Sequence, residues 1–107
     1  MRDESKPQIL VSQIGDAVRD GAWIEIDCEE TAFRDGNQNR GLWRPFVCDH
    51  VRGSDQVERA VVVATRGLQP RTFKTIVGLS RFAMDLGMDK CEFPLVEGEI
   101  AVWKFDG

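Results

Sequence analysis

Residues 57–86 read VERAVVVATRGLQPRTFKTIVGLSRFAMDL, and two elements of different periodicity follow each other within them. The first, Val57 to Thr65, is apolar on both faces, which is typical of a strand buried inside a sheet. Gly67 to Pro70 interrupts this run. From Arg71 to Leu86 the apolar residues return with a helical period and cover about half of the circumference or more. We therefore predict a buried strand followed by a helix that packs on it and ends at Gly87.

A first helix and a first strand are predicted before this unit. Ser5 can cap a helix whose first turn contains Pro7, and Gly21 can adopt the left-handed conformation that ends it. From Ala22 to Cys28 apolar and polar residues alternate with period two, which predicts a half-buried strand. The Gly, Asn and Asp residues of the segment from Glu29 to Gly41 then indicate a mobile loop or the tip of a long hairpin.

Three further strands complete the predicted sheet. Pro45 cannot donate a hydrogen bond to a neighbouring strand, so we expect the strand from Leu42 to Val51 to lie at an edge or to contain a bulge. Two short strands, Cys91 to Val96 and Ile100 to Phe105, flank a tight turn at Glu97-Gly98. The order α-β-β-β-α-β-β predicts a single α+β domain over residues 1–107, with a mostly antiparallel sheet, both helices packed on one face, and a flexible N-terminus at residues 1–6.

The composition is that of a small globular protein. The chain has 107 residues, 42% of them apolar, and a net charge of -4, and no apolar run reaches the roughly 18 residues of a membrane span. Its N-terminus lacks the basic start and apolar core of a secretory signal. The three cysteines, Cys28, Cys48 and Cys91, are odd in number and widely spaced. We expect a cytoplasmic protein without disulfides, metal or cofactor, and without a membrane partner.

The positive charge is concentrated in one segment. No acid occurs from Arg59 to Met84, and the five cations of this segment are Arg59, Arg66, Arg71, Lys74 and Arg81. On a helix, three of these cations surround Gly78 on one polar arc, and the bare glycine would let another chain approach the backbone. We predict a partner-binding stripe of Arg71, Lys74, Gly78 and Arg81, with Arg66 and Trp43 beside it; the alternative is a stripe that only water covers.

Two other surface features accompany this stripe. The acids Glu25, Asp27, Glu29 and Glu30 form a secondary acidic face, which is the next candidate for a partner contact. In Trp43-Arg44-Pro45-Phe46 the two aromatic residues fall on opposite faces of a strand, so we expect one of them to be exposed as an interface anchor.

Cys48-Asp49-His50 suggests catalytic or metal chemistry. Cys48 and His50 would face the same side of a strand, and Cys28 and Cys91 could complete a zinc set of three cysteines and one histidine. No Cys-x-x-Cys pair supports such a site. Residues i and i+2 of one strand are also about 6–7 Å apart, too far for a direct nucleophile–base hydrogen bond. We expect the cysteines to be small core residues.

Arg66-Gly67-Leu68-Gln69-Pro70-Arg71, between a strong strand and a helix, resembles the pyrophosphate loop of the GNAT acyltransferases over about 30 residues, Val61 to Phe93. The resemblance implies an acyltransferase-like enzyme or an inactive relative. The chain departs from the family pattern because Gln69 and Arg71 stand where glycines are expected, Pro70 removes a donor, and no tyrosine is present to act as general acid.

The residues together favour a small non-catalytic module that binds another protein through its surface. Acidic domains of this kind are often regulators or inhibitors, including those made by phages and other mobile elements. The main alternative is a nucleic-acid-binding protein that uses the basic segment from Arg66 to Arg81, for which steep salt dependence of binding is the expected sign. The acyltransferase-like enzyme is the second alternative.

Overall fold

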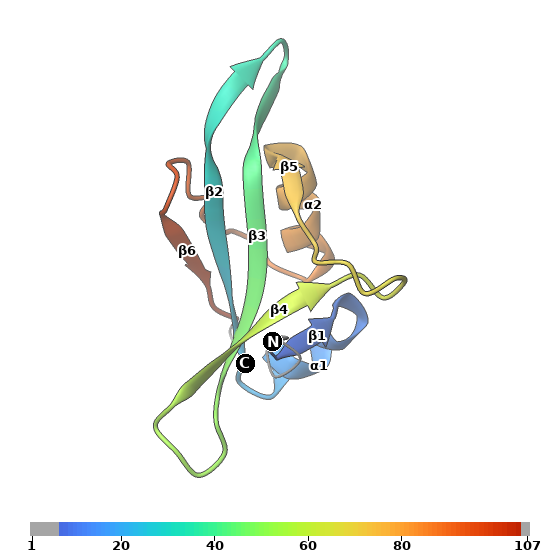
Figure 1. The fold of residues 1–107 in the computed structure, drawn as a ribbon, viewed down its shortest axis with the longest axis vertical. Coiled ribbons are helices and arrows are strands. Elements are labelled where there is room, and N and C mark those ends of the chain that lie inside the picture. Colours follow the sequence, from blue (N-terminus) through green and yellow to red (C-terminus); the bar gives the residue numbers. More distant parts are fainter. Residues whose placement is uncertain (1–6, 106–107) are drawn as a thin grey trace, which may run out of the picture.

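A long antiparallel hairpin forms the middle of the sheet in the computed structural model, which describes residues 7–105 (Figure 1). Its strands are β2 (Trp23–Asp35) and β3 (Gln38–His50). Around it the other strands are added in the order β1-β4-β3-β2-β6, and β5 pairs with β3 beyond the end of β4. Their bounds are β1 (Gln8–Leu10), β4 (Val57–Val63), β5 (Phe73–Thr75) and β6 (Ile100–Trp103).

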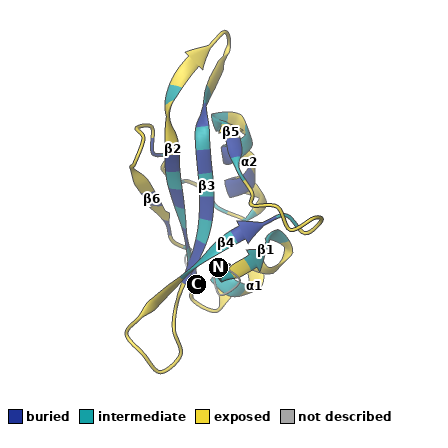
Figure 2. Cartoon of the chain, viewed as in Figure 1, coloured by how far each residue is buried: buried dark blue, intermediate teal, exposed yellow. Residues whose placement is uncertain are grey.

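Alternation along the central strands determines which face of the sheet is buried. Ile24, Ile26 and Cys28 of β2 lie opposite Val47, Pro45 and Trp43 of β3, and all six are buried on one face. A 3₁₀ turn (Val11–Gln13) leads into α1 (Ile14–Arg19), and α2 (Ile76–Asp85) follows β5. Ile14 of α1 and Leu79, Phe82 and Ala83 of α2 join the same core cluster. Figure 2 shows this buried middle of the hairpin and its exposed ends.

The predicted class is therefore confirmed. The chain is a single α+β domain with two α-helices and a six-stranded, mostly antiparallel sheet. The parallel pair in the sheet is β1 with β4. The observed elements differ from the predicted ones in four respects, and each difference has a hydrogen-bond reason.

The N-terminal helix is shorter than predicted. Residues 1–6, including the expected cap Ser5 and the expected flexible terminus, lie outside the described residues. Gln8–Leu10 is a strand, because the outer edge of β4 needs partners for its backbone groups; the amide of Val61 donates to the carbonyl of Pro7 at 3.0 Å. The predicted end is right, since Gly21 follows α1 with a φ of 109°.

The second helix begins at Ile76 instead of Arg71. The preceding residues are extended because they pair with strands: the amide of Arg71 donates to the carbonyl of Val62 at 2.8 Å, and Phe73 lies opposite Trp43. Thr75 caps the helix, its hydroxyl accepting from the amide of Gly78 at 3.0 Å. The helix packs against β3 and β5 instead of β4.

Pro45 does not place its strand at an edge, but the second alternative, an irregular strand, is found: the pairing of β3 with β5 shifts register between Arg40 and Trp43. β3 is central, between β2 on one side and β4 and β5 on the other. Pairing with β4 begins at Phe46 and pairing with β5 ends at Trp43. Pro45 therefore lies where one neighbour replaces the other, at a point where no donor is required.

The segment from Cys91 to Val96 is not a strand. It crosses the core side as an irregular chain and offers carbonyl groups to two buried indoles, which need an acceptor when they are out of water. The Nε1 of Trp43 donates to Pro94 and the Nε1 of Trp103 donates to Glu92, both at 2.7 Å. The turn predicted at Glu97-Gly98 is present, with Gly98 at a φ of 91°.

Glu29 to Gly41 forms the tip of the long hairpin, the second of the two structures that its composition indicated. β2 and β3 continue through most of it with register shifts after Cys28 and Glu30. Gly36, the first of the two turn residues, has a φ of 62°, which suits the type II′ turn of two-residue hairpins.

Candidate protein-binding site

Three of the predicted site cations line one hollow of about 680 Å³. Arg71 belongs to the segment before β5, Lys74 to β5 and Arg81 to α2, so they do not form the helical stripe that the sequence predicted. The structure nevertheless brings them together, because β5 runs back beside β3 and α2 then folds over it. We call this feature the cationic hollow.

The floor of the cationic hollow is aromatic. Phe73 and Phe82 both line it with the small part of each ring that the core leaves exposed, and their ring centroids are 4.9 Å apart. The guanidinium of Arg71 lies 4.7 Å from the centroid of Phe73, close enough for a cation–π contact. Asp85 is the acid among the lining residues. The site therefore combines a basic rim with an apolar base.

Gly78 lines the same hollow, but its first role is in the helix cap. A Cβ at this position would lie 3.2 Å from the Thr75 hydroxyl oxygen and 3.7 Å from the Phe73 ring. The glycine thus leaves room for the hydrogen bond between the Thr75 hydroxyl and the Gly78 amide. It also adds no side chain to the lining of the cationic hollow, to which Lys74 and Arg81 contribute theirs.

Two predicted members of the site do not line the hollow. Arg66 is exposed in the loop between β4 and β5 and is not among the lining residues. Trp43 is 0% exposed, so the expectation that it acts as a surface anchor is wrong. Its indole fills the core and holds the Pro94 carbonyl, while Phe46, on the opposite face, is half-buried beneath Arg59.

The predicted acidic face is largely neutralised by arginines from neighbouring strands. Glu25 and Asp27 both accept hydrogen bonds from Arg59, and Glu29 lies 3.3 Å from Arg44. Burial lowers the pKa of Arg59, but its bonds to Asp27 and Glu25 outweigh this effect and the pKa is raised. Glu30 is exposed. Arg59 is therefore committed to these ion pairs and does not add to the basic surface of its segment.

The cysteines do not converge. Cys28 faces the core side of the sheet, whereas Cys48 lies on the opposite face with Glu25 and Arg59. Among residues 7–105 no group of three metal-ligating side chains is found. Burial raises the pKa of Cys48 to about 11, with the charge of Glu25 adding to the effect. This holds the thiol in its unreactive protonated form at neutral pH.

The strand–loop–helix arrangement on which the resemblance to the acyltransferases rested is absent. Residues 66–71 lead into β5, and only then does α2 begin. Leu68 in this loop has a φ of 53°, and the first turn of α2 is already capped by Thr75. The loop therefore does not present its amides together with a helix N-terminus.

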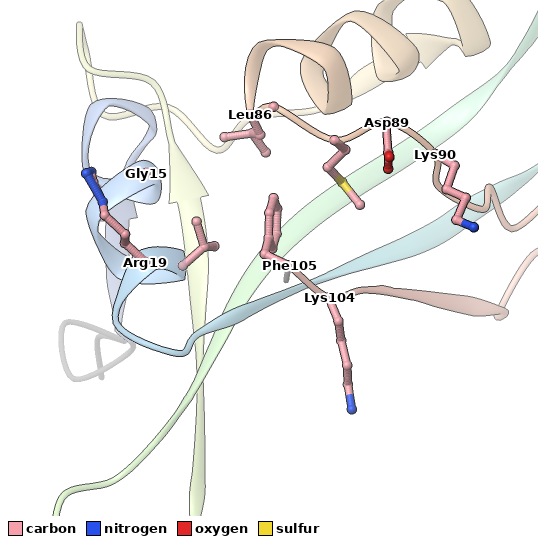
Figure 3. A pocket seen from close by; sticks show the side chains of 10 residues that line it. Gly15, Arg19, Leu86, Asp89, Lys90, Lys104 and Phe105 are labelled. Atoms are coloured by element: carbon pink, nitrogen blue, oxygen red, sulfur yellow. The ribbon is translucent and has the colours of Figure 1, made fainter. Parts of the chain in front are cut away.

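Sequence reasoning missed a second hollow, of about 720 Å³, beside the first. It lies between α1, the turn after α2 and the end of β6, with the ring of Phe105 in its middle (Figure 3). Arg19, Lys90 and Lys104 stand around its rim. These residues are spread over more than 80 positions of the chain, and no local pattern connects them.

The fold and this basic surface define a small α+β protein with an open, aromatic-floored cationic hollow. No family model, curated protein or solved structure matches the chain. None of the helices formed by residues 7–105 has the length and apolar character to cross a membrane.

Proposed function

We propose that the protein is a non-catalytic module that binds another protein by receiving an acidic segment of that partner in the cationic hollow. The observation that carries this proposal is the convergence on one hollow of Arg71 from the segment before β5, Lys74 from β5 and Arg81 from α2. Within the described residues no carboxylate lies within 4.0 Å of any of the three, whereas Arg19, Arg40, Arg44 and Arg59 all have such partners. A cation without an internal partner remains available to an external one.

The two components of the hollow suit two phases of binding. Its charges would attract an acidic surface over the distance at which exposed charges act, and so accelerate association. Its aromatic floor, Phe73 and Phe82, would retain an apolar side chain of the partner and slow dissociation. A module of this size that covers a surface on its partner would act as a regulator or inhibitor.

The proposal is tested by comparing three forms of the immobilised protein for the partners that they retain from cell lysate. These are the wild type, Lys74→Glu/Arg81→Glu, and the control Arg34→Glu/Arg52→Glu, whose exposed arginines lie at the two hairpin ends. Both double variants lower the net charge equally. A binding partner should be retained by the wild type and the control and lost by the first variant, and its affinity is then measured with purified protein.

Equal retention by all three forms would contradict the proposal. The partner would then bind a surface of the protein other than the cationic hollow.

Nucleic acid binding is the second candidate function, favoured by the exposed Arg66, which precedes Arg71 by five residues in the acid-free segment. It predicts binding of duplex or single-stranded oligonucleotides whose affinity falls steeply with salt concentration. Asp85 in the hollow opposes it, because a carboxylate repels a phosphate backbone.

A further inference from the structure

The two hollows adjoin each other. Gly15 of α1 and Leu86 at the end of α2 line both of them. Because the hollows share these two residues, we treat them as one surface, which we call the two-hollow groove. Figure 3 shows its second hollow, with Gly15 at one side and Phe105 in the middle.

The charge of this groove is opposite to that of the chain. Six cations line it, with the two acids Asp85 and Asp89, although the chain as a whole has 14 basic and 18 acidic residues. The six are Arg19, Arg71, Lys74, Arg81, Lys90 and Lys104. Arg19 is partly neutralised by Asp16 at 2.5 Å, so Lys90 and Lys104 are the stronger attractions in the second hollow.

Apolar surface continues along the same path. Phe73 and Phe82 form the floor of the cationic hollow, and Met88 and Phe105 extend it into the second. Figure 3 shows the Phe105 ring between Leu86 and the α1 side of the hollow, while Lys90 and Lys104 extend outward at the rim. Basic side chains thus flank an apolar path through both hollows.

Building on the function proposed above, we propose that the partner's binding segment is an extended peptide with alternating acidic and apolar side chains that spans both hollows across Gly15. Charge complementarity supports the acidic positions, and the aromatic path supports the apolar ones. An extended chain advances roughly 3.3 Å per residue, so a segment that enters both hollows across Gly15 is longer than one that occupies the cationic hollow alone. A nucleic acid would place a phosphate beside Asp85 and Asp89, whereas a peptide can set apolar side chains there.

Gly15 is the point where the proposal can be tested sterically. A Cβ at this position would meet no atom closer than the Arg19 Nη2, at 3.9 Å. A large side chain here would therefore stand in the junction of the hollows without disturbing the core, and it would leave the charge unchanged. Because most residues have a higher helix propensity than glycine, the substitution should not destabilise α1.

The experiment measures fluorescence polarisation of labelled peptides of four and eight residues that alternate glutamate and leucine. The proteins are the wild type, Gly15→Phe, Lys90→Glu/Lys104→Glu, Lys74→Glu/Arg81→Glu, and the control Arg34→Glu/Arg52→Glu. Thermal unfolding confirms that each variant is folded. We expect the longer peptide to bind the wild type about tenfold more tightly, because its second half binds without a further loss of translational freedom.

The variants separate the inference from the function on which it rests. Lys90→Glu/Lys104→Glu should remove the advantage of the longer peptide and leave the shorter one unaffected. Gly15→Phe should remove the same advantage by blocking the junction of the hollows, whereas Lys74→Glu/Arg81→Glu should weaken both peptides. An advantage that survives Gly15→Phe, or equal binding of both peptides, would overturn the spanning segment but leave the cationic hollow as the site. Failure of the wild type to bind either peptide, or tighter binding of a single-stranded oligo(dT), would overturn the proposed function as well.

Discussion

Gly41 has the least space of any glycine in the described structure. A Cβ there would lie 2.8 Å from the Trp43 ring and 3.1 Å from the Glu30 carbonyl oxygen. The indole of Trp43 can therefore lie across the strand and reach the Pro94 carbonyl only because residue 41 has no side chain.

We expect Gly41→Ala to lower the free energy of unfolding by about 1–3 kcal/mol, as overpacking a closed core does. Chemical denaturation monitored by tryptophan fluorescence measures this. The matched control is Gly15→Ala, where the space is open and the change should be neutral or stabilising. A Gly41→Ala protein as stable as the parent would show that the Trp43 ring can move aside.

The raised pKa of the Cys48 thiol predicts how the free energy of unfolding changes at alkaline pH. Below pH 9 the thiol is protonated in both the folded and the unfolded chain; above it the unfolded thiol ionises, while the folded one, with its pKa raised to about 11, does not. The free energy of unfolding should therefore fall as the pH rises from about 9 to 11. Thermal melts across this range should show a smaller fall in melting temperature for Cys48→Ala than for the wild type. Part of the fall should remain in the variant, because burial also raises the pKa values of Cys28 and Cys91. Parallel declines in the two proteins would contradict this reading of the Cys48 environment.

At the scale of elements, irregular segments are positioned by single hydrogen bonds from the sheet and its core. The irregular segment between α2 and β6 has no strand ladder, yet its carbonyls accept hydrogen bonds from the indoles of Trp43 and Trp103 and from the amide of Ala32. Because Met88 and Lys90 line the second hollow, the path of this segment also shapes that surface.

Trp43→Phe should loosen this segment. Phenylalanine keeps most of the buried ring but leaves the Pro94 carbonyl without its donor, at a cost of about 1–3 kcal/mol for the unpaired group. Hydrogen exchange should show faster exchange at the Ala32 amide, which donates to Leu95 at 2.8 Å. Exchange at the β3–β4 ladder serves as the internal reference, and an equal increase there would indicate general destabilisation instead.

At the scale of the whole molecule, charge is separated between the two faces. The acids of β2 are matched by Arg59 and Arg44 on the face opposite the helices. Of the cations of the two-hollow groove, Arg19 pairs with Asp16, and the other five have no carboxylate partner among residues 7–105. Association with an acidic partner should therefore be directed to the groove.

For a partner identified as above, Lys74→Glu/Arg81→Glu should reduce the association rate constant by about tenfold or more at low salt, with a smaller difference at high salt. Surface plasmon resonance at several salt concentrations measures the rate constants. Thermal stability should change little, since both positions are exposed. Unchanged association would exclude steering by these two charges and would direct attention to Glu30 and the rest of the acidic face.

Local patterns were sufficient to predict the α+β class, the alternating strand at Ala22, the turn at Glu97-Gly98 and the ends of both helices. Each depends on residues adjacent in the chain, as at Gly21 and Gly87, where a positive φ suits glycine. The basic composition of the main site was visible for the same reason, because Arg71, Lys74 and Arg81 lie in one acid-free segment.

Tertiary structure decided the rest, because the missing information lay in distant partners. Gln8–Leu10 and Phe73–Thr75 are strands since β4 and β3 have edges to be paired. The carbonyls of Glu92, Pro94 and Leu95 accept hydrogen bonds from Trp103, Trp43 and Ala32. The burial of Trp43 and the ion pairing of Arg59 depend on residues that are distant in the sequence, so the residues next to them in the chain do not predict either. The second hollow exists only when α1, the turn after α2 and Phe105 beyond β6 meet, because side chains from separate segments form one surface only after the backbone has folded.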